Sequence, residues 1–385
     1  MKLALPLALH IGVAALALAT QPVHACLNDR DTLAIEAQRQ PDVLQAITGR
    51  FERNPPLYYQ MRLARVAKDL RAHLGNLDEY DDAAVACDRL GRDDEAIVWM
   101  NEKRAQLAPL AGADAALKEE WYKYYANIGT CRVHRWIRAG ADRKHLAEVR
   151  KAHSEITQAI KINPNAHFGR EKYQQIVMEW LIDPIEHTER GAPAQPLWQY
   201  VGTKVNSEQF PQAATGFAGL IMLGNAWESV DIFSTLASVC LTAEQSPTHL
   251  GYLAALRADE LTATGHQSLL HGVDPAFDRT NGTKNDKENY NALRAEAVQW
   301  HAARTAYMNA RLQAGRHPDT DSTFWADYHS SPPFKIPYEK TRLQQKKDFE
   351  RLALGVAIFI ALLVITPIIV MVYKSVGARR RRGGQ

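Results

Sequence analysis

Residues 80–100 read YDDAAVACDRLGRDDEAIVWM, and this stretch decides the fold that the sequence predicts. Small residues stand at Ala83 and again at Ala96, and Gly91 separates the two runs. Two antiparallel helices need a small side chain where they come closest, and bulky residues such as Tyr80 fill the space around that point. The stretch therefore predicts a helical hairpin.

Two other stretches repeat the pattern. In the first, Tyr125 and Gly129 open the unit and Ala152 and Ile156 close it, and an insertion between its halves should extend the first helix through Trp136. The second repeat of the pattern is weaker and keeps only part of the spacing (Leu223, Gly224, Ser229, Phe233 and Leu236).

This spacing resembles that of tetratricopeptide (TPR) repeats over roughly residues 49–243. Residues 49–59 and 163–171 also resemble a group of exported bacterial TPR proteins of unassigned function. Two positions depart from the TPR consensus, because Lys103 replaces a small residue and Arg132 replaces an aromatic one. The resemblance implies stacked hairpins that bind a peptide or a partner helix on a concave surface, with no catalysis.

The rest of the body is also helical in character, since strand patterns are scarce and Ala, Leu, Arg, Glu and Gln dominate. Residues 57–74, 93–107, 119–138 and 290–312 have apolar side chains three and four positions apart. The predicted fold class is all-α, an α-solenoid of TPR-like helical hairpins plus one C-terminal transmembrane helix. Its expected parts are a signal peptide (1–25), an N-terminal helical segment (26–76), TPR-like repeats (77–190), weaker helical repeats or a cap (197–329), a Pro-rich and charged stalk (330–350), a transmembrane helix (352–373) and a basic cytoplasmic tail (374–385).

The two ends predict the location. Lys2, an apolar run and the Val23–Ala25 exit are typical of a secretory signal, and Cys26 leaves lipidation of the new N-terminus open. Leu352–Tyr373 holds 22 residues without a charged side chain, and a helix of roughly 33 Å would cross a hydrocarbon core of about 30 Å. Because basic residues flank this run on both sides, its orientation depends on the leader. We therefore expect a single-pass protein of the bacterial inner membrane with a periplasmic body and a cytoplasmic C-terminus.

Charge argues against nucleic-acid binding. The chain has 46 basic and 43 acidic residues, but six of the basic ones lie in the leader or in the last twelve residues. The body is therefore slightly acidic and offers no uniform field to a phosphate backbone. We expect other proteins or peptides as partners, together with the membrane through the C-terminal helix, and neither a nucleic acid nor a small-molecule cofactor.

The candidate binding surface follows from the first helices of the two clearer repeats. The first carries acidic side chains and the second mainly basic or amide ones, so the groove should run from acidic to basic and favour a partner of matching polarity. The candidate binding residues are Asp78, Asp81, Asp82, Asp88, Lys123, Asn127 and Arg132.

Catalytic and metal-binding motifs are missing from the sequence. It has no His-Glu-x-x-His, Gly-x-Ser-x-Gly, P-loop, Gly-x-Gly-x-x-Gly or Cys-x-x-Cys motif, so we expect a membrane-anchored binding scaffold of the cell envelope, with no enzyme activity, no cofactor and no metal. One alternative is a tail-anchored adaptor that faces the cytoplasm. Another is an envelope enzyme with a dispersed active site, which would need Glu52, Asp183 and Glu228 to meet in a pocket. Whether Cys87 and Cys131 pair stays open.

Overall fold

The computed structural model describes residues 27–38, 40–110, 114–189, 194–242, 248–277 and 284–332, and part of the helical stretch between 344 and 365. Over these residues the regular elements are all helical. The α-helices are α1 (Arg30–Gln38), α2 (Val43–Thr48), α3 (Pro56–Ala72), α4 (Leu77–Arg89), α5 (Asp93–Leu107), α6 (Ala115–Arg138), α7 (Ala147–Ile162), α8 (Arg170–Glu189), α9 (Leu197–Lys204), α10 (Phe210–Met222), α11 (Val230–Thr242), α12 (Thr248–Ala263) and α13 (Lys284–Gln313). The short 3₁₀ turns are η1 (Ala166–Gly169), η2 (Ser207–Gln209) and η3 (Ala226–Glu228).

The predicted hairpins are present as packed helix pairs. α4 packs against α5, and Gly91 makes the turn between them with a left-handed φ of +72°. α6 continues through Trp136 as predicted and packs along α7. A Cβ at Gly129 would lie 3.0 Å from the Ala152 carbonyl oxygen and from Ile156, so the small residue marks the closest approach of this pair.

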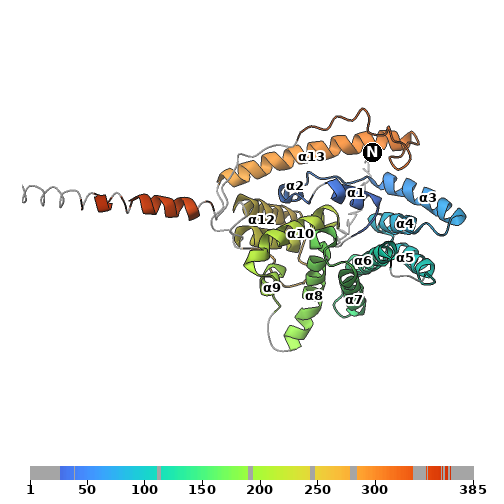
Figure 1. Ribbon diagram of the computed structural model, residues 1–385, viewed down its shortest axis with the longest axis horizontal. Coiled ribbons are helices and arrows are strands. Elements are labelled where there is room, and N and C mark those ends of the chain that lie inside the picture. Colours follow the sequence, from blue (N-terminus) through green and yellow to red (C-terminus); the bar gives the residue numbers. More distant parts are fainter. Residues whose placement is uncertain are drawn as a thin grey trace, which may run out of the picture.

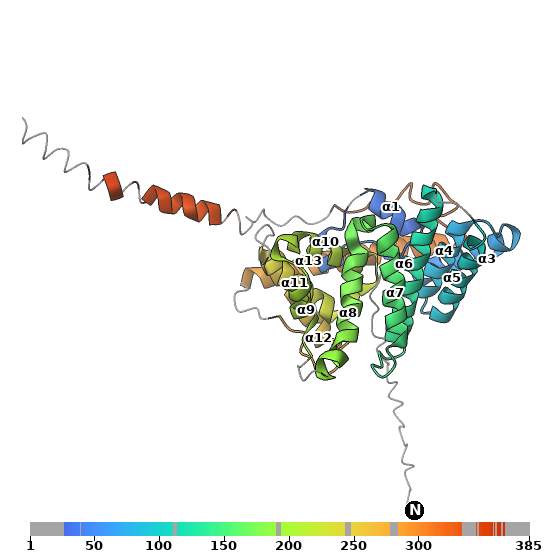
Figure 2. The same cartoon turned by 60° about the horizontal axis from the view of Figure 1, so that its bottom comes forward.

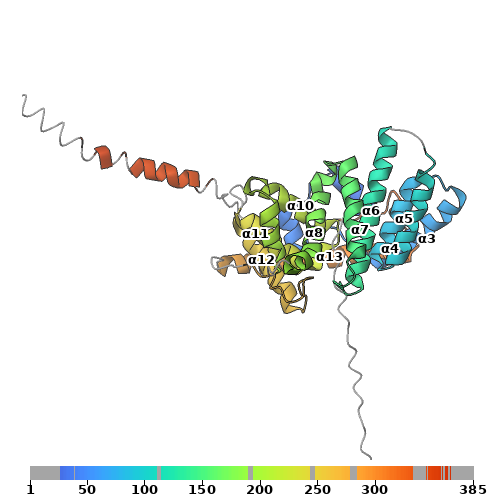
Figure 3. The ribbon, with the colours of Figure 1, turned by 90° about the horizontal axis from the view of Figure 1, so that it is seen from below.

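The remaining helices enclose the larger apolar core. α10 and α11 lie side by side, and α11 also packs against α9 and α12. Phe217, Phe233 and Leu236 are fully buried there. Figures 2 and 3 show α6, α7 and α8 arranged side by side, so that they join the core of the first hairpins to this second core.

The expected α-solenoid is wrong, because α13 joins early and late helices of the described body. In a solenoid each repeat contacts only its neighbours. Here α13 runs across the molecule from α12 to α3 and also packs on α2 (Figure 1). The chain after α13 then turns back, and the Ser331 carbonyl oxygen accepts a hydrogen bond of 2.5 Å from Arg50. The shown architecture is an all-α protein built from adjacent helix pairs.

The predicted transmembrane helix at Leu352–Tyr373 must also be corrected. Among the residues that the structure describes, no helix combines the length and the apolar character needed to cross a membrane. Residues 357, 359, 363, 364 and 366–373 of the predicted span lie outside the described residues, as do the predicted signal peptide, Cys26 and the basic tail.

Candidate functional site

The surface between α4 and α6 holds the segment of the protein's own chain that leads into α1. The main-chain N–H of Asn28 donates to Asn127 Oδ1 at 2.7 Å, and Asn127 Nδ2 donates back to the Asn28 carbonyl oxygen at 3.0 Å. Both side chains are fully buried. One amide on α6 thus satisfies both main-chain groups of one residue, and such contacts do not depend on which side chain that residue carries.

A second main-chain contact lies two residues further on. The N–H of Arg30 donates to Asp82 Oδ1 at 3.1 Å, and the Arg30 guanidinium binds Asp82 Oδ2 at 2.5 Å. Asp81 joins the two contacts, because its Oδ1 accepts from Asn127 Nδ2 at 2.9 Å. Asp81, Asp82 and Asn127 therefore hold residues 28 to 30 on the predicted surface.

The predicted acidic and basic residues neutralise one another across this surface. Lys123 Nζ lies 2.7 Å from Asp78 and 2.9 Å from Glu120, and Lys103 Nζ lies 2.5 Å from Asp81 and 2.7 Å from Glu120. Burial raises the pKa of Asp81 to about 7, although the Lys103 ammonium opposes the shift. Burial opposes the charge of Lys123, but its hydrogen bonds to Asp78 and Glu120 outweigh that cost and raise its pKa.

Three carboxylates of this cluster lie close enough together to be considered as a metal site. Oxygens of Asp78, Asp81 and Glu120 all lie within 4.8 Å of one another. The ammonium groups of Lys103 and Lys123 already bond to these carboxylates and offset two of their three charges. We therefore assign the cluster to ion pairing between helices.

Two of the predicted binding residues lie elsewhere. Asp88 is fully buried and hydrogen-bonds His134 and Arg138. Burial opposes ionisation of Asp88, but His134 and Arg138 outweigh it and lower its pKa, while burial lowers the pKa of His134 to about 4. Arg132 pairs with Glu155 of α7 at 3.0 Å. The structure brings together Asp78, Asp81, Asp82, Lys123 and Asn127, and it uses Asp88 and Arg132 to join helices.

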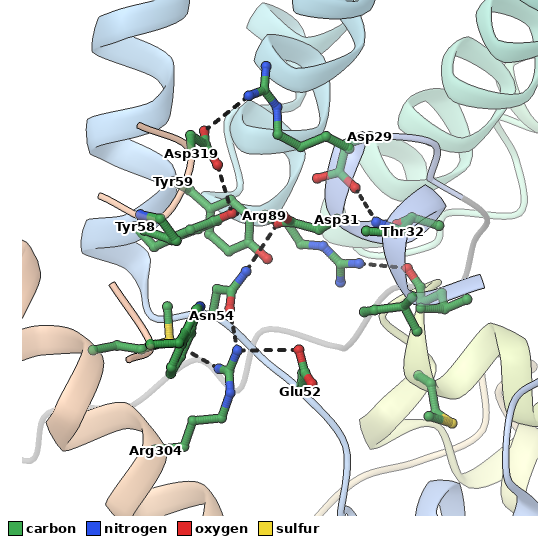
Figure 4. A pocket seen from close by; sticks show the side chains of 18 residues that line it. Asp29, Asp31, Thr32, Glu52, Asn54, Tyr58, Tyr59, Arg89, Arg304 and Asp319 are labelled. Carbon is green, nitrogen blue, oxygen red and sulfur yellow. Dashed lines mark hydrogen bonds and ion pairs between the residues drawn. The ribbon is translucent and has the colours of Figure 1, made fainter. Parts of the chain in front are cut away.

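A cavity of about 430 Å³ is lined by residues 29–32 and by side chains of α3 and α13, among others (Figure 4). Behind its wall, the fully buried Arg62 binds Asp29 at 3.0 Å, Asp31 at 2.9 Å and Asp319 at 2.6 Å. Tyr58 also hydrogen-bonds Asp31 and Asp319. Burial opposes the charge of Asp319, but Arg62 outweighs it and lowers the pKa of this carboxyl. The network ties α1 and α3 to the turn that follows α13.

The proposed dispersed active site does not assemble in this cavity. Its lining includes Glu52 but neither Asp183 nor Glu228. Cys87 and Cys131 are buried in one core cluster, and both are free thiols in the structure. Burial raises the pKa of Cys87 to about 12, so this thiol stays protonated and unreactive near neutral pH.

Sequence analysis missed two residues that organise the site. In the sequence, Lys103 was noted only because it departs from the TPR consensus. In the structure it is fully buried and pairs with Asp81 and Glu120. Arg62 gave no signal, because its partners lie about 30 residues earlier and more than 250 residues later in the chain. An unusual Lys at a position reserved for a small residue was the only available clue.

Comparisons with protein-family models, with curated proteins and with solved structures found no match to this chain. The residues that the structure describes establish an all-helical protein with packed helix pairs.

Proposed function

We propose that the helix pairs are TPR-like hairpins and that the protein is a scaffold that binds an extended segment of another protein beside its own residues 28–30. The leader favours an exported body, so the partner would be another protein of the cell envelope. The observation that carries the proposal is a cavity of about 260 Å³ between residues 28–33, α4 and α6. Asn127 and Asp82 already bind the main chain of residues 28 and 30, and side chains of this kind on the surface suit a second chain alongside.

The protein's own segment forms one wall of this site and stays in place. Displacing it would separate Asp29 and Asp31 from the buried Arg62, and breaking a buried ion pair costs about 3–5 kcal/mol. A short partner segment would have to overcome that cost before binding. Binding beside residues 28–30 avoids it.

Two features of the cavity favour a basic side chain from the partner. Asn28 lines the cavity, is fully buried, and its Oδ1 accepts no hydrogen bond. Asp78 also lines the cavity; its side chain is 69% exposed, and it shares the ammonium of Lys123 with Glu120. A Lys or Arg can donate to Asn28 Oδ1 and pair with the Asp78 carboxylate.

The test uses two libraries of short randomised peptides, one with a fixed central Lys and one with a fixed central Gln. The immobilised full chain should capture the Lys library preferentially, and added salt should weaken this preference. Asp78→Asn should reduce the preference severalfold, whereas Glu102→Gln, an exposed carboxylate on α5, should leave it unchanged. Equal capture of both libraries by the unaltered chain would refute the proposal.

A further inference from the structure

A third cavity, of about 190 Å³, lies between residues 51–56, Tyr59, the end of α4 and the chain around η3. Five residues line both this cavity and the one of about 430 Å³: Glu52, Asn54, Tyr59, Arg89 and Met222. It is separate from the cavity beside Asn28, so the inference below stands independently of the proposed function.

Two arginines line this cavity without a carboxylate partner. Arg53 lies over the rings of Phe51 and Trp227, at 4.6 and 4.8 Å from their centroids, and its Nη1 is buried without a hydrogen bond. Arg89 donates from Nη2 to the Leu223 carbonyl oxygen at 2.6 Å, but its buried Nε has no hydrogen-bond partner. Among the described residues, no ion pair joins either guanidinium to an acidic side chain.

Two further arginines add positive charge beside this cavity. Arg257 and Arg294 also lie over the Trp227 ring, at 3.9 and 5.1 Å, and they share the single carboxylate of Glu260. Burial and the charges of Arg294 and Arg257 lower the pKa of Arg53 to about 10, although the Glu228 carboxylate acts to raise it. Arg53 therefore keeps its charge near neutral pH, although leaving a buried cation without a counter-ion is costly.

The lining of the cavity determines which kind of anion would fit. Phe51, Trp227 and Ile221 supply aromatic and apolar surface. Burial raises the pKa of Tyr59 to about 12, so its hydroxyl stays protonated and able to donate. The planar fork of an arginine matches a carboxylate, whereas Glu52 in the same lining disfavours a dianion.

We propose that this cavity binds a carboxylate carried on a small apolar or aromatic body, with Arg53 and Arg89 gripping the carboxylate and Phe51 and Trp227 enclosing the body. The carboxylate can belong to a free acid or to the C-terminus of a peptide. Both sources present the same group to the two arginines, and the experiment separates them.

The experiment is calorimetric titration of the full chain with benzoate, with N-acetyl-phenylalanine, with the amide of N-acetyl-phenylalanine, and with inorganic phosphate. Both carboxylates should bind and the amide should not. Tighter binding of benzoate indicates a free acid, and tighter binding of N-acetyl-phenylalanine indicates a peptide terminus. Arg53→Gln and Arg89→Gln should each weaken binding about tenfold or more, because each loses a hydrogen bond to a charged group.

The matched control is Arg143→Gln, since Arg143 also has a buried Nε without a partner but lines neither cavity. Its affinity for benzoate should be unchanged. Circular dichroism establishes whether each variant is folded, and the titration of the unaltered chain gives a result even if a variant unfolds. Failure of both carboxylates to bind the unaltered chain would overturn the proposal, as would tighter binding of phosphate.

Discussion

The two cores of the molecule are stabilised in different ways. α4 buries four acidic residues, Glu79, Asp81, Asp82 and Asp88, and each of the three aspartates has a cationic partner on another element. In α10 and α11 the only buried charged residue is Asp231. The first core thus depends on which residues stand opposite one another, and the second depends on the shape and volume of its side chains. The experiments below test this contrast.

The largest effect is expected at Arg62. Arg62→Met would leave the buried carboxylate of Asp29 without its cationic partner, and Asp319 would keep mainly its pairing with Arg65. We therefore expect a loss of about 3–5 kcal/mol in the free energy of unfolding near neutral pH. Urea denaturation measures it. Because Arg62 lowers the pKa of Asp319, this stability is present above the unfolded pKa of the carboxyl and is lost as the pH falls.

The control for Arg62 is Arg104→Met, at an exposed position of α5. It should change the free energy of unfolding by less than about 0.5 kcal/mol. Equal losses in the two variants would show that the network does not stabilise the first core.

The next pair compares the two cores directly. Lys103→Met should cost about 3 kcal/mol near neutral pH, because Asp81 and Glu120 lose their buried ammonium. Leu236→Ala should cost about 2–5 kcal/mol through the cavity that it leaves. Urea denaturation near pH 7 and near pH 4.5 distinguishes them. The loss in the free energy of unfolding of Lys103→Met should be smaller at the lower pH, because the carboxylates take up protons. The loss of Leu236→Ala should be the same at both pH values. The same pH dependence in both variants would contradict the difference between the two cores.

Asp231 is the exception within α10 and α11. It is 2% exposed; its Oδ2 accepts from the N–H of Leu269 at 2.9 Å, while its Oδ1 has no partner. Burial raises its pKa to about 6. Since the folded pKa exceeds the unfolded one, the native state binds more protons between about pH 4 and 6, and stability from this group is lost as the pH rises through that window.

Asp231→Asn should therefore be more stable than the unaltered protein near pH 7.5 by up to about 3 kcal/mol, and equal to it near pH 4. Urea denaturation at both values measures the difference. Glu208→Gln, at an exposed position, serves as the control and should show no such change. A variant that is less stable than the unaltered protein at the higher pH would contradict the shift.

The smallest effects concern shape alone. A methyl group at Gly216 would lie 2.1 Å from Cδ2 of the fully buried Tyr173, whereas one at Gly219 would lie 3.3 Å from Cδ of the Arg170 side chain. Gly216→Ala should cost about 1–3 kcal/mol through overpacking. Gly219→Ala should be neutral or should gain up to about 1 kcal/mol from helix propensity. Thermal unfolding compares the two variants, and similar midpoints would show that the second core tolerates added volume.

The sequence predicted the helices whose positions depend on residues that are close together in the chain. α5 spans the expected 93–107, and α6 continues through Trp136 as predicted. Periodicity identifies the apolar face of a helix but not the element that covers it, which is why the packing of α13 on α3 was missed. The candidate surface was found through Asp81 and Asn127, but its occupation by residues 28–30 depends on contacts about 50 to 100 residues apart.

The position of α13 has a consequence for how the protein unfolds. A linear array of repeats frays from its ends, because removing one unit disturbs only the next. Here the helix that closes the molecule touches early and late elements together, so loosening either end releases contacts at the other. We expect the protected amides of α3, α12 and α13 to exchange at similar rates, because these helices open as one cooperative unit. The long sequence separation of their contacts should also make folding slower than in an array of similar length.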